Sequence, residues 1–314
     1  MDLPELSAAV AEARRRIGGR VRRTPVVDAV VPTPAGPREV TFKLEYLQHS
    51  GSFKARGSIN AVLAASEQGL IGESGIAIAS GGNAGIAAAW SAAQVGCPAS
   101  VFVPENAPAA KIARLRSLGA DVVLKGKEYA EALHAAEEFV RRSGALQLHA
   151  YDLPDVVAGA GVVGLELLEQ RPDIDTVLVA VGGGGLVAGI ASAVTPRHVV
   201  GVEPSGIPTL ADALAAGAPV DVPVDSIAAD ALGARRLGEI AYAVTTQAKV
   251  QSVLIPDAEI VRARAWLWGE LRVAVEYAAA TALAPLLSGA FVPAEGARVA
   301  VILCGANTDP SDLS

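Results

Sequence analysis

Short apolar runs rich in valine and isoleucine alternate along this chain with longer alanine-rich segments of helical character. The apolar runs occupy residues 40–45, 75–79, 100–103, 121–124, 176–181, 199–202, 252–255 and 299–303. The helical segments between them include residues 84–95, 109–118, 130–142, 187–193 and 257–270. Strand, helix and strand in this order need crossover connections, which favour parallel pairing. We therefore expect an α/β protein with open, mostly parallel twisted sheets and helices on both faces.

The length of 314 residues allows one large or two medium-sized domains. Residues 71–149 form a strand–helix series of their own, so we expect them to be a small inserted α/β domain. Residues 1–70 and 150–314 would then make up the large, ligand-binding domain.

Composition excludes several classes of partner and compartment. The net charge of −7 argues against nucleic acid, because a polyanion needs a basic surface. The acidic N-terminus does not have the character of a signal peptide, and no apolar run approaches the ~18 residues of a membrane span. Two cysteines, Cys97 and Cys304, make no disulfide framework. We expect a cytoplasmic protein with a small-molecule substrate, without membrane or nucleic-acid contact.

Four consecutive glycines, Gly182, Gly183, Gly184 and Gly185, join an apolar strand to a helix that starts near Leu186. Backbone N–H groups in such a turn can converge on an anion, and the helix N-terminus adds partial positive charge. Glycine also permits close approach of a ligand. A tight turn without a ligand is the alternative, but four glycines exceed what a turn requires.

A dinucleotide site is a rival interpretation of the same run. Gly183, Gly185 and Ala188 fit G-x-G-x-x-A, and Glu203 follows where a ribose-binding acid belongs. This hypothesis, a nucleotide-binding oxidoreductase, leaves Lys54 unexplained. Lys54 lies in a turn-prone segment, residues 49–57, where a lysine is usually a solvated surface charge. Together, a reactive amine and a phosphate-binding turn suit an aldehyde cofactor that carries a phosphate.

Two further segments follow apolar strands. Ser80, Gly81, Gly82 and Asn83 connect a strand to a helix, where they can cap the helix or bind a carboxylate. Cys304 emerges from the last strand. Cysteine is often only a small core residue, but the carboxyl end of a strand is the ligand side of an open α/β sheet.

Taken together and in this order, these segments resemble the fold-type II pyridoxal-phosphate enzymes, which have a tryptophan synthase β-like fold of two domains. Among them, the chain is most similar to the serine/threonine dehydratases (deaminases). The resemblance extends over nearly the whole chain. It is carried by residues 52–57, 80–83, 150–152 with 158–161, 182–186, 202–204, 226–228 with 232–233, and 304–305.

The resemblance implies a role for each candidate residue. Lys54 would hold pyridoxal 5′-phosphate as a Schiff base and act as the catalytic base, while Phe53 packs against the ring. Asn83 would bond the ring's 3-oxygen, and Cys304 would face the pyridine nitrogen. The phosphate would be bound by Gly182, Gly183, Gly184, Gly185 and Leu186. The substrate carboxylate would be received by the loop of Ser80, Gly81, Gly82 and Asn83, with Ser80 also counted as catalytic.

The activity implied is a lyase reaction: L-threonine or L-serine would give 2-oxobutyrate or pyruvate plus ammonia. Three positions depart from relatives. Ala84 stands where many have histidine, and Gly81 stands where serine racemases have a second serine, so we expect dehydration with little racemisation. Glu203 fits one ligand of the divalent-cation site found in some relatives. Thr209 stands where those relatives have the second acid, which speaks against a metal.

Other reactions of the same fold remain open at this point. They are serine racemisation, dehydration of hydroxyaspartate or of a bulkier hydroxyamino acid, and β-replacement of the cysteine-synthase kind. A binding protein that kept the cofactor pocket but lost turnover is a further alternative. Relatives suggest a homodimer. Biosynthetic threonine deaminases carry an end-product-sensing domain after the segment that corresponds to Cys304, whereas this sequence runs only to Ser314, so we expect a catabolic enzyme without that domain.

Overall fold

The computed structural model describes residues 1–313. Its strands are β1 (Val26–Thr33), β2 (Gly36–Lys43), β3 (Ile76–Ala79), β4 (Ala99–Val103), β5 (Asp121–Leu124), β6 (Leu146–Gln147), β7 (Thr176–Ala180), β8 (His198–Pro204), β9 (Gln251–Ile255) and β10 (Val299–Ile302). Its helices are α1 (Leu3–Ile17), α2 (Lys54–Glu67), α3 (Asn83–Val95), α4 (Ala109–Ser117), α5 (Tyr129–Ser143), α6 (Pro154–Gln170), α7 (Gly185–Val194), α8 (Thr209–Ala216), α9 (Ala229–Leu232), α10 (Glu239–Gln247), α11 (Asp257–Leu271), α12 (Tyr277–Thr281) and α13 (Ala284–Ser288). Short 3-10 turns occur at Glu45–Leu47, His49–Gly51 and Ser311–Leu313.

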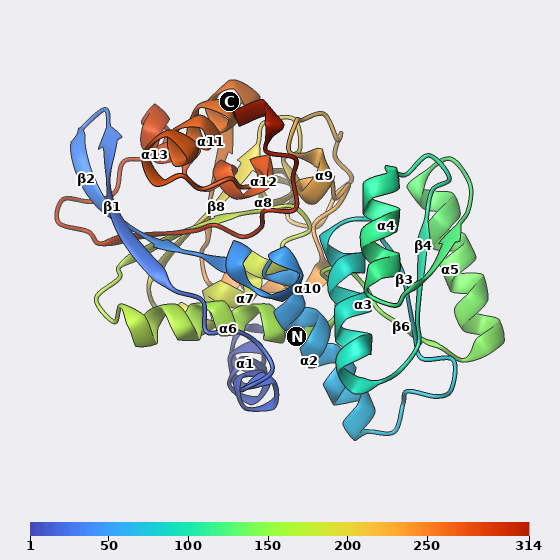
Figure 1. Cartoon of the computed structure of the whole chain (residues 1–314). Coiled ribbons are helices and arrows are strands. Elements are labelled where there is room, and N and C mark those ends of the chain that lie inside the picture. The colour runs from blue at the N-terminus through green and yellow to red at the C-terminus, as the bar shows by residue number, and fades with distance from the viewer. Residues whose placement is uncertain (314) are drawn as a thin grey trace.

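The larger sheet has the strand order β1-β2-β10-β7-β8-β9. Only the β1–β2 hairpin is antiparallel; the other neighbours pair in parallel. Helices α1, α6, α7 and α10 pack together below this sheet in Figure 1, whereas α11, α12 and α13 lie above it. The valine-rich strand β7 is buried along its whole length, as a central parallel strand covered on both faces must be.

The smaller sheet has the order β5-β4-β3-β6 and is parallel throughout. Helix α3 contacts β3 and β4, and α5 packs against the same two strands and β6. Figure 1 shows this sheet and its helices as a separate body beside the larger one, with α2 between the two. Apolar side chains are correspondingly gathered into a large core cluster and smaller clusters around β3 and β4.

The fold class expected from the sequence is confirmed: two open, mostly parallel sheets carry helices on both faces. Each expected strand overlaps an observed one, with ends that differ by a few residues. The sequence pattern did not single out α1, α2, α6 or the hairpin strand β1. All strands of the smaller sheet lie within residues 76–147, inside the segment expected to be a small domain, and the exact boundaries stay a prediction. None of the helices in residues 1–313 is long and apolar enough to cross a lipid bilayer.

Three strands deliver the candidate residues to one region. Strand β3 ends just before Ser80, β7 just before the glycine run, and β10 just before Cys304. Parallel strands present their carboxyl ends on one side of a sheet, where ligands of α/β folds bind. The site therefore lies at the carboxyl ends of these strands, near the start of α2.

Candidate active site

Lys54 is the first residue of α2, the helix that lies between the two bodies in Figure 1. Its Nζ donates a hydrogen bond to the carbonyl oxygen of Ala150 at 2.8 Å and lies 5.1 Å from the centre of the Phe53 ring. Burial lowers the pKa of the amine to about 8, although the nearby Glu276 carboxylate acts in the opposite direction. A lysine that is largely neutral just above physiological pH is a competent nucleophile and base, unlike a solvated surface lysine.

The segment that carries Lys54 is fastened to the end of β10. The backbone N–H of Phe53 donates to the carbonyl oxygen of Cys304 at 3.0 Å. Ser52 and Gly305 form an isolated antiparallel bridge, and the N–H of Ala306 donates to Gly51 O at 3.0 Å. These contacts hold the amine and the thiol segment in a fixed relation, although they are about 250 residues apart in the sequence.

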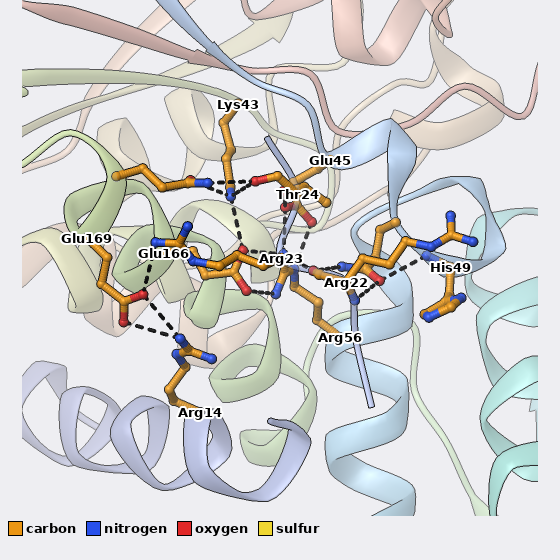
Figure 2. A network of polar contacts seen from close by, with 12 residues as sticks. Arg14, Arg22, Arg23, Thr24, Lys43, Glu45, His49, Arg56, Glu166 and Glu169 are labelled. Carbon is orange, nitrogen blue, oxygen red and sulfur yellow. Dashed lines mark hydrogen bonds and ion pairs between the residues drawn. The ribbon is translucent and has the colours of Figure 1, made fainter. Parts of the chain in front are cut away.

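A buried ionic network anchors α2 through Arg56, two residues after Lys54 (Figure 2). The Arg56 guanidinium is fully buried and donates two hydrogen bonds of 2.8 Å to each of two carboxylates, those of Glu45 and Glu166. Lys43 Nζ donates to Glu166 Oε2 at 3.0 Å. Two cations thus face two carboxylates with every oxygen hydrogen-bonded, the condition under which buried charges are tolerated.

The glycine run forms the start of α7. Gly184 is the residue before the helix and has φ +87°, a conformation that side chains other than glycine rarely adopt. A Cβ at Gly183 would overlap the ring of Tyr151, which packs directly on the turn. The first N–H groups of a helix have no intrahelical acceptor, so those of Gly185 and Leu186 are available to an anion.

The loop after β3 places Asn83 at the first turn of α3. The Asn83 amide nitrogen donates to both oxygens of Glu276 at 2.9 Å, and its carbonyl accepts from Asn307 Nδ2 at 2.7 Å. Asn83 is therefore oriented by two side chains from the larger body. Ser80 accepts a long hydrogen bond of 3.4 Å from Gly82 N, which shapes the turn before the helix.

Glu276 is a site residue that the sequence analysis missed. It is 6% exposed, and its Oε1 also accepts from the Asn307 backbone N–H at 2.7 Å. Burial raises the pKa of this carboxyl despite the donors around it. No local signal marks it, because it precedes a helix of only five residues and lies 193 positions from Asn83.

Cys304 is buried at the end of β10, and it lines the same cavity as Lys54. Burial, followed by the nearby Glu276 carboxylate, raises the pKa of its thiol well above the ordinary value. The thiol therefore stays protonated and is at most a weak hydrogen-bond donor.

One cavity collects most of the candidate residues. Its lining includes Phe53, Lys54, Asn83, Tyr151, Gly182, Gly183, Gly184, Gly185, Leu186, Leu232, Glu276 and Cys304. Ser80, Gly81 and Gly82 form the loop immediately before Asn83 and do not line it. A wider groove of about 750 Å³, bordered by Asp175, His198 and Gln251, lies at the amino ends of β7, β8 and β9, away from this chemistry.

Glu203 lies outside the cavity and has other partners. Its carboxylate accepts from Thr209 Oγ1 at 2.9 Å, from Leu210 N at 2.6 Å, from Ala211 N at 2.9 Å and from Ser252 Oγ at 3.0 Å. These bonds satisfy both oxygens and cap the start of α8. Within residues 1–313, no cluster of three or more His, Cys, Asp or Glu side chains is arranged to hold a metal ion.

Comparison with known proteins gives the family. A family model for pyridoxal-phosphate dependent enzymes matches residues 17–305. This chain belongs to that family. The L-threonine ammonia-lyase of Geobacter sulfurreducens is 36% identical over 97% of this chain and 76% of its own length. The phenylserine dehydratase of Ralstonia pickettii is 36% identical over 99% of this chain and 96% of its own.

A solved structure supports the same assignment. Maize serine racemase superposes with a TM-score of 0.88 at 31% identity, over 98% of this chain and 94% of that one. The chain is thus a fold-type II enzyme of the serine/threonine dehydratase family, and its cofactor is pyridoxal 5′-phosphate. The oxidoreductase hypothesis is wrong, since the glycine run that suggested it belongs to a pyridoxal-phosphate fold.

The residues present fit this cofactor. A part-buried amine with a lowered pKa suits an aldehyde, and a glycine turn at a helix start suits a phosphate. The fully buried thiol of Cys304 offers no charge to a ring nitrogen.

Proposed function

We propose that this protein is a pyridoxal-phosphate-dependent ammonia-lyase that converts L-threonine or L-serine to 2-oxobutyrate or pyruvate plus ammonia. The observation that carries the proposal is the position of Lys54: a part-buried amine with a pKa of about 8 that shares one cavity with the glycine turn, Asn83 and Cys304. The similarity to L-threonine ammonia-lyases supports the substrate class.

The roles of the chain's own residues follow from their chemistry. Lys54 would hold the cofactor through its aldehyde, and as a free amine it would take the proton from the substrate Cα. The N–H groups at residues 182–186 bind the phosphate. Asn83, held by Glu276 and Asn307, donates to the ring 3-oxygen. The cofactor, when bound, supplies an electron sink for the electrons freed at Cα.

The ring nitrogen and the substrate carboxylate have separate partners in this proposal. Cys304 would present a neutral thiol to the nitrogen, and a neutral thiol would not protonate the ring there. The Ser80 loop receives the carboxylate at the start of α3, where the helix dipole favours an anion. The β-hydroxyl leaves as water, and the released product takes water back as it gives up ammonia. Because Gly81 stands where serine racemases have a second serine, this position has no side chain that would return a proton to Cα, and racemisation should stay minor.

A second candidate is dehydration of a bulkier hydroxyamino acid such as phenylserine. It is favoured by the Ralstonia phenylserine dehydratase, which matches at the same identity and over nearly its whole length. One added ring changes the apolar contacts of the pocket but none of the roles above, so a substrate comparison decides between the two.

The test is ketoacid release from purified enzyme given L-threonine, L-serine, L-threo-phenylserine and 3-hydroxyaspartate. We expect threonine or serine to have the highest kcat/KM, Lys54→Ala to abolish turnover, and Lys125→Ala, an exposed lysine, to retain it. Higher kcat/KM with phenylserine selects the second candidate. Accumulation of a D-amino acid without ketoacid from every substrate overturns both.

We further propose that the protein is a cytoplasmic homodimer in which residues 71–149 form the small domain. Light scattering coupled to size-exclusion chromatography measures the first point, and a single 31.8 kDa species contradicts it. Limited proteolysis that releases a stable fragment cut near residues 70 and 150 supports the second.

A further inference from the structure

A small cavity lies beside Lys54, next to the one that contains the glycine turn. Its volume is about 20 Å³, and a buried water needs roughly 10–15 Å³. The cavity therefore has room for one water molecule and for nothing larger. Its wall is contributed by α2, by the first turns of α3, and by the chain just before α6, through Lys54, Ser58, Ala84, Ala87, His149 and Ala150.

Ser58 supplies an unusual polar atom to this cavity. The residue is 8% exposed, and its Oγ is one of four buried side-chain polar atoms in residues 1–313 without a hydrogen-bond partner. It does not even bond to the carbonyl of the preceding turn, the usual partner of a serine inside a helix. A buried hydroxyl left unbonded is destabilising, so a small polar ligand in the cavity would be favoured.

Lys54 has unused hydrogen-bonding capacity on the same side. Ser58 follows Lys54 by four residues on α2, so both side chains lie on one face of the helix. The ammonium group has three N–H donors, and Ala150 O takes one of them at 2.8 Å. A water between the two side chains can accept from Nζ and donate to Ser58 Oγ.

We propose that this cavity binds one water molecule that links Lys54 Nζ to Ser58 Oγ, which makes Ser58 a positioning residue for the amine. The inference rests on the proposed role of Lys54 as the cofactor-binding lysine. Together, Ala150 O and the water hold the free amine in one orientation while it is detached from the cofactor. A cation of similar size is disfavoured here, because it would lie against the ammonium charge.

The consequence that can be measured is the acidity of Lys54 in the full-length protein freed of cofactor. The water accepts a hydrogen bond from the charged form, so its loss lowers the pKa of the amine. Ser58→Ala removes the hydroxyl that holds the water. It leaves the titratable groups around Lys54 in place, which are Cys304, Glu276, His149 and Tyr151. Ser91→Ala is the matched control, since Ser91 Oγ is also buried and unbonded but does not line the cavity.

The experiment is competitive acylation over a pH series, with the Lys54 peptide quantified by mass spectrometry and the exposed Lys125 as internal reference. We expect Ser58→Ala to shift the Lys54 profile down by about one pH unit, a tenfold change in the acidity constant, and Ser91→Ala to overlay wild type. Crystals of both proteins should show the water in wild type and not in Ser58→Ala. An unshifted profile, an equal shift in Ser91→Ala, or a water retained at full occupancy in Ser58→Ala overturns the proposal. Failure of the proposed function would appear separately, as a wild-type Lys54 that pyridoxal phosphate and borohydride do not modify.

Discussion

Glu166→Gln tests whether the buried network behind Lys54 stabilises the fold (Figure 2). The substitution keeps the shape of the side chain but removes its charge. Glu166 accepts hydrogen bonds from Arg56 Nη1 and Nη2 at 2.8 Å and from Lys43 Nζ at 3.0 Å. The amide can satisfy only part of this set, and the network is left with one uncompensated buried positive charge.

The expected loss is about 3–5 kcal/mol of unfolding free energy, the range found when one partner of a buried ion pair is removed. That is a large part of the ~5–15 kcal/mol by which proteins are usually stable. Glu169→Gln is the matched control on the same helix. Glu169 pairs with Arg14 and Arg23, but its side chain is 44% exposed, so its loss should cost about 0–1 kcal/mol.

The assay is equilibrium urea unfolding of both variants and wild type, followed by tryptophan fluorescence and by far-ultraviolet circular dichroism. Coincident transitions from the two probes justify a two-state fit. A Glu166→Gln midpoint that shifts no further than that of Glu169→Gln refutes the reasoning, because the network would then contribute no more than a surface pair.

Unfolding at acidic pH independently tests whether the ionised Glu166 carboxylate stabilises the folded state. Burial raises the pKa of Glu166, but the hydrogen bonds and charges of Arg56 and Lys43 outweigh it and leave the pKa below the ordinary 4.5. A carboxyl with a lowered folded-state pKa contributes stability that is present above its unfolded pKa and lost as pH falls through the folded value. The difference in unfolding free energy between wild type and Glu166→Gln should therefore become smaller below about pH 4.5.

Three further predictions concern the site. Burial lowers the pKa of Lys54 to about 8, so the rate at which cofactor-free protein recombines with pyridoxal phosphate should rise with pH and level off above about pH 8. A recombination rate that keeps rising toward pH 10 would contradict this. Gly183→Ala should weaken pyridoxal-phosphate affinity at least tenfold in a fluorescence titration, since its Cβ overlaps the Tyr151 ring, whereas Gly72→Ala, which meets no atom within 4 Å, should bind as wild type. Burial raises the folded-state pKa of Glu276, so its ionisation above about pH 4.5 destabilises the wild-type protein. Glu276→Gln cannot ionise and should therefore gain stability relative to wild type as the pH rises. Parallel curves of unfolding free energy against pH would refute this.

Part of the site could be predicted from short segments of sequence. The glycine turn was visible because backbone geometry demands glycine locally: Gly184 has a positive φ and Gly183 lies against Tyr151. Lys54 and Cys304 were singled out by their sequence context and given roles by the resemblance, and the structure brings them together in one cavity. Their contacts with the cofactor stay predictions. Glu203 shows the limit of such patterns, because this acid fits the spacing of a ribose-binding or metal-binding residue but caps α8.

The sequence by itself determined the alternation of strands and helices, because the periodicity of apolar residues reflects which faces of each element are buried. It also determined where tight turns meet helix starts. Only the tertiary structure decided that Glu276 orients Asn83, that Arg56 is neutralised by Glu45 and Glu166, and that Ser58 faces a cavity beside Lys54. These contacts arise from packing between separate elements, most of them distant along the chain, and such packing leaves no periodic trace in the residues between them.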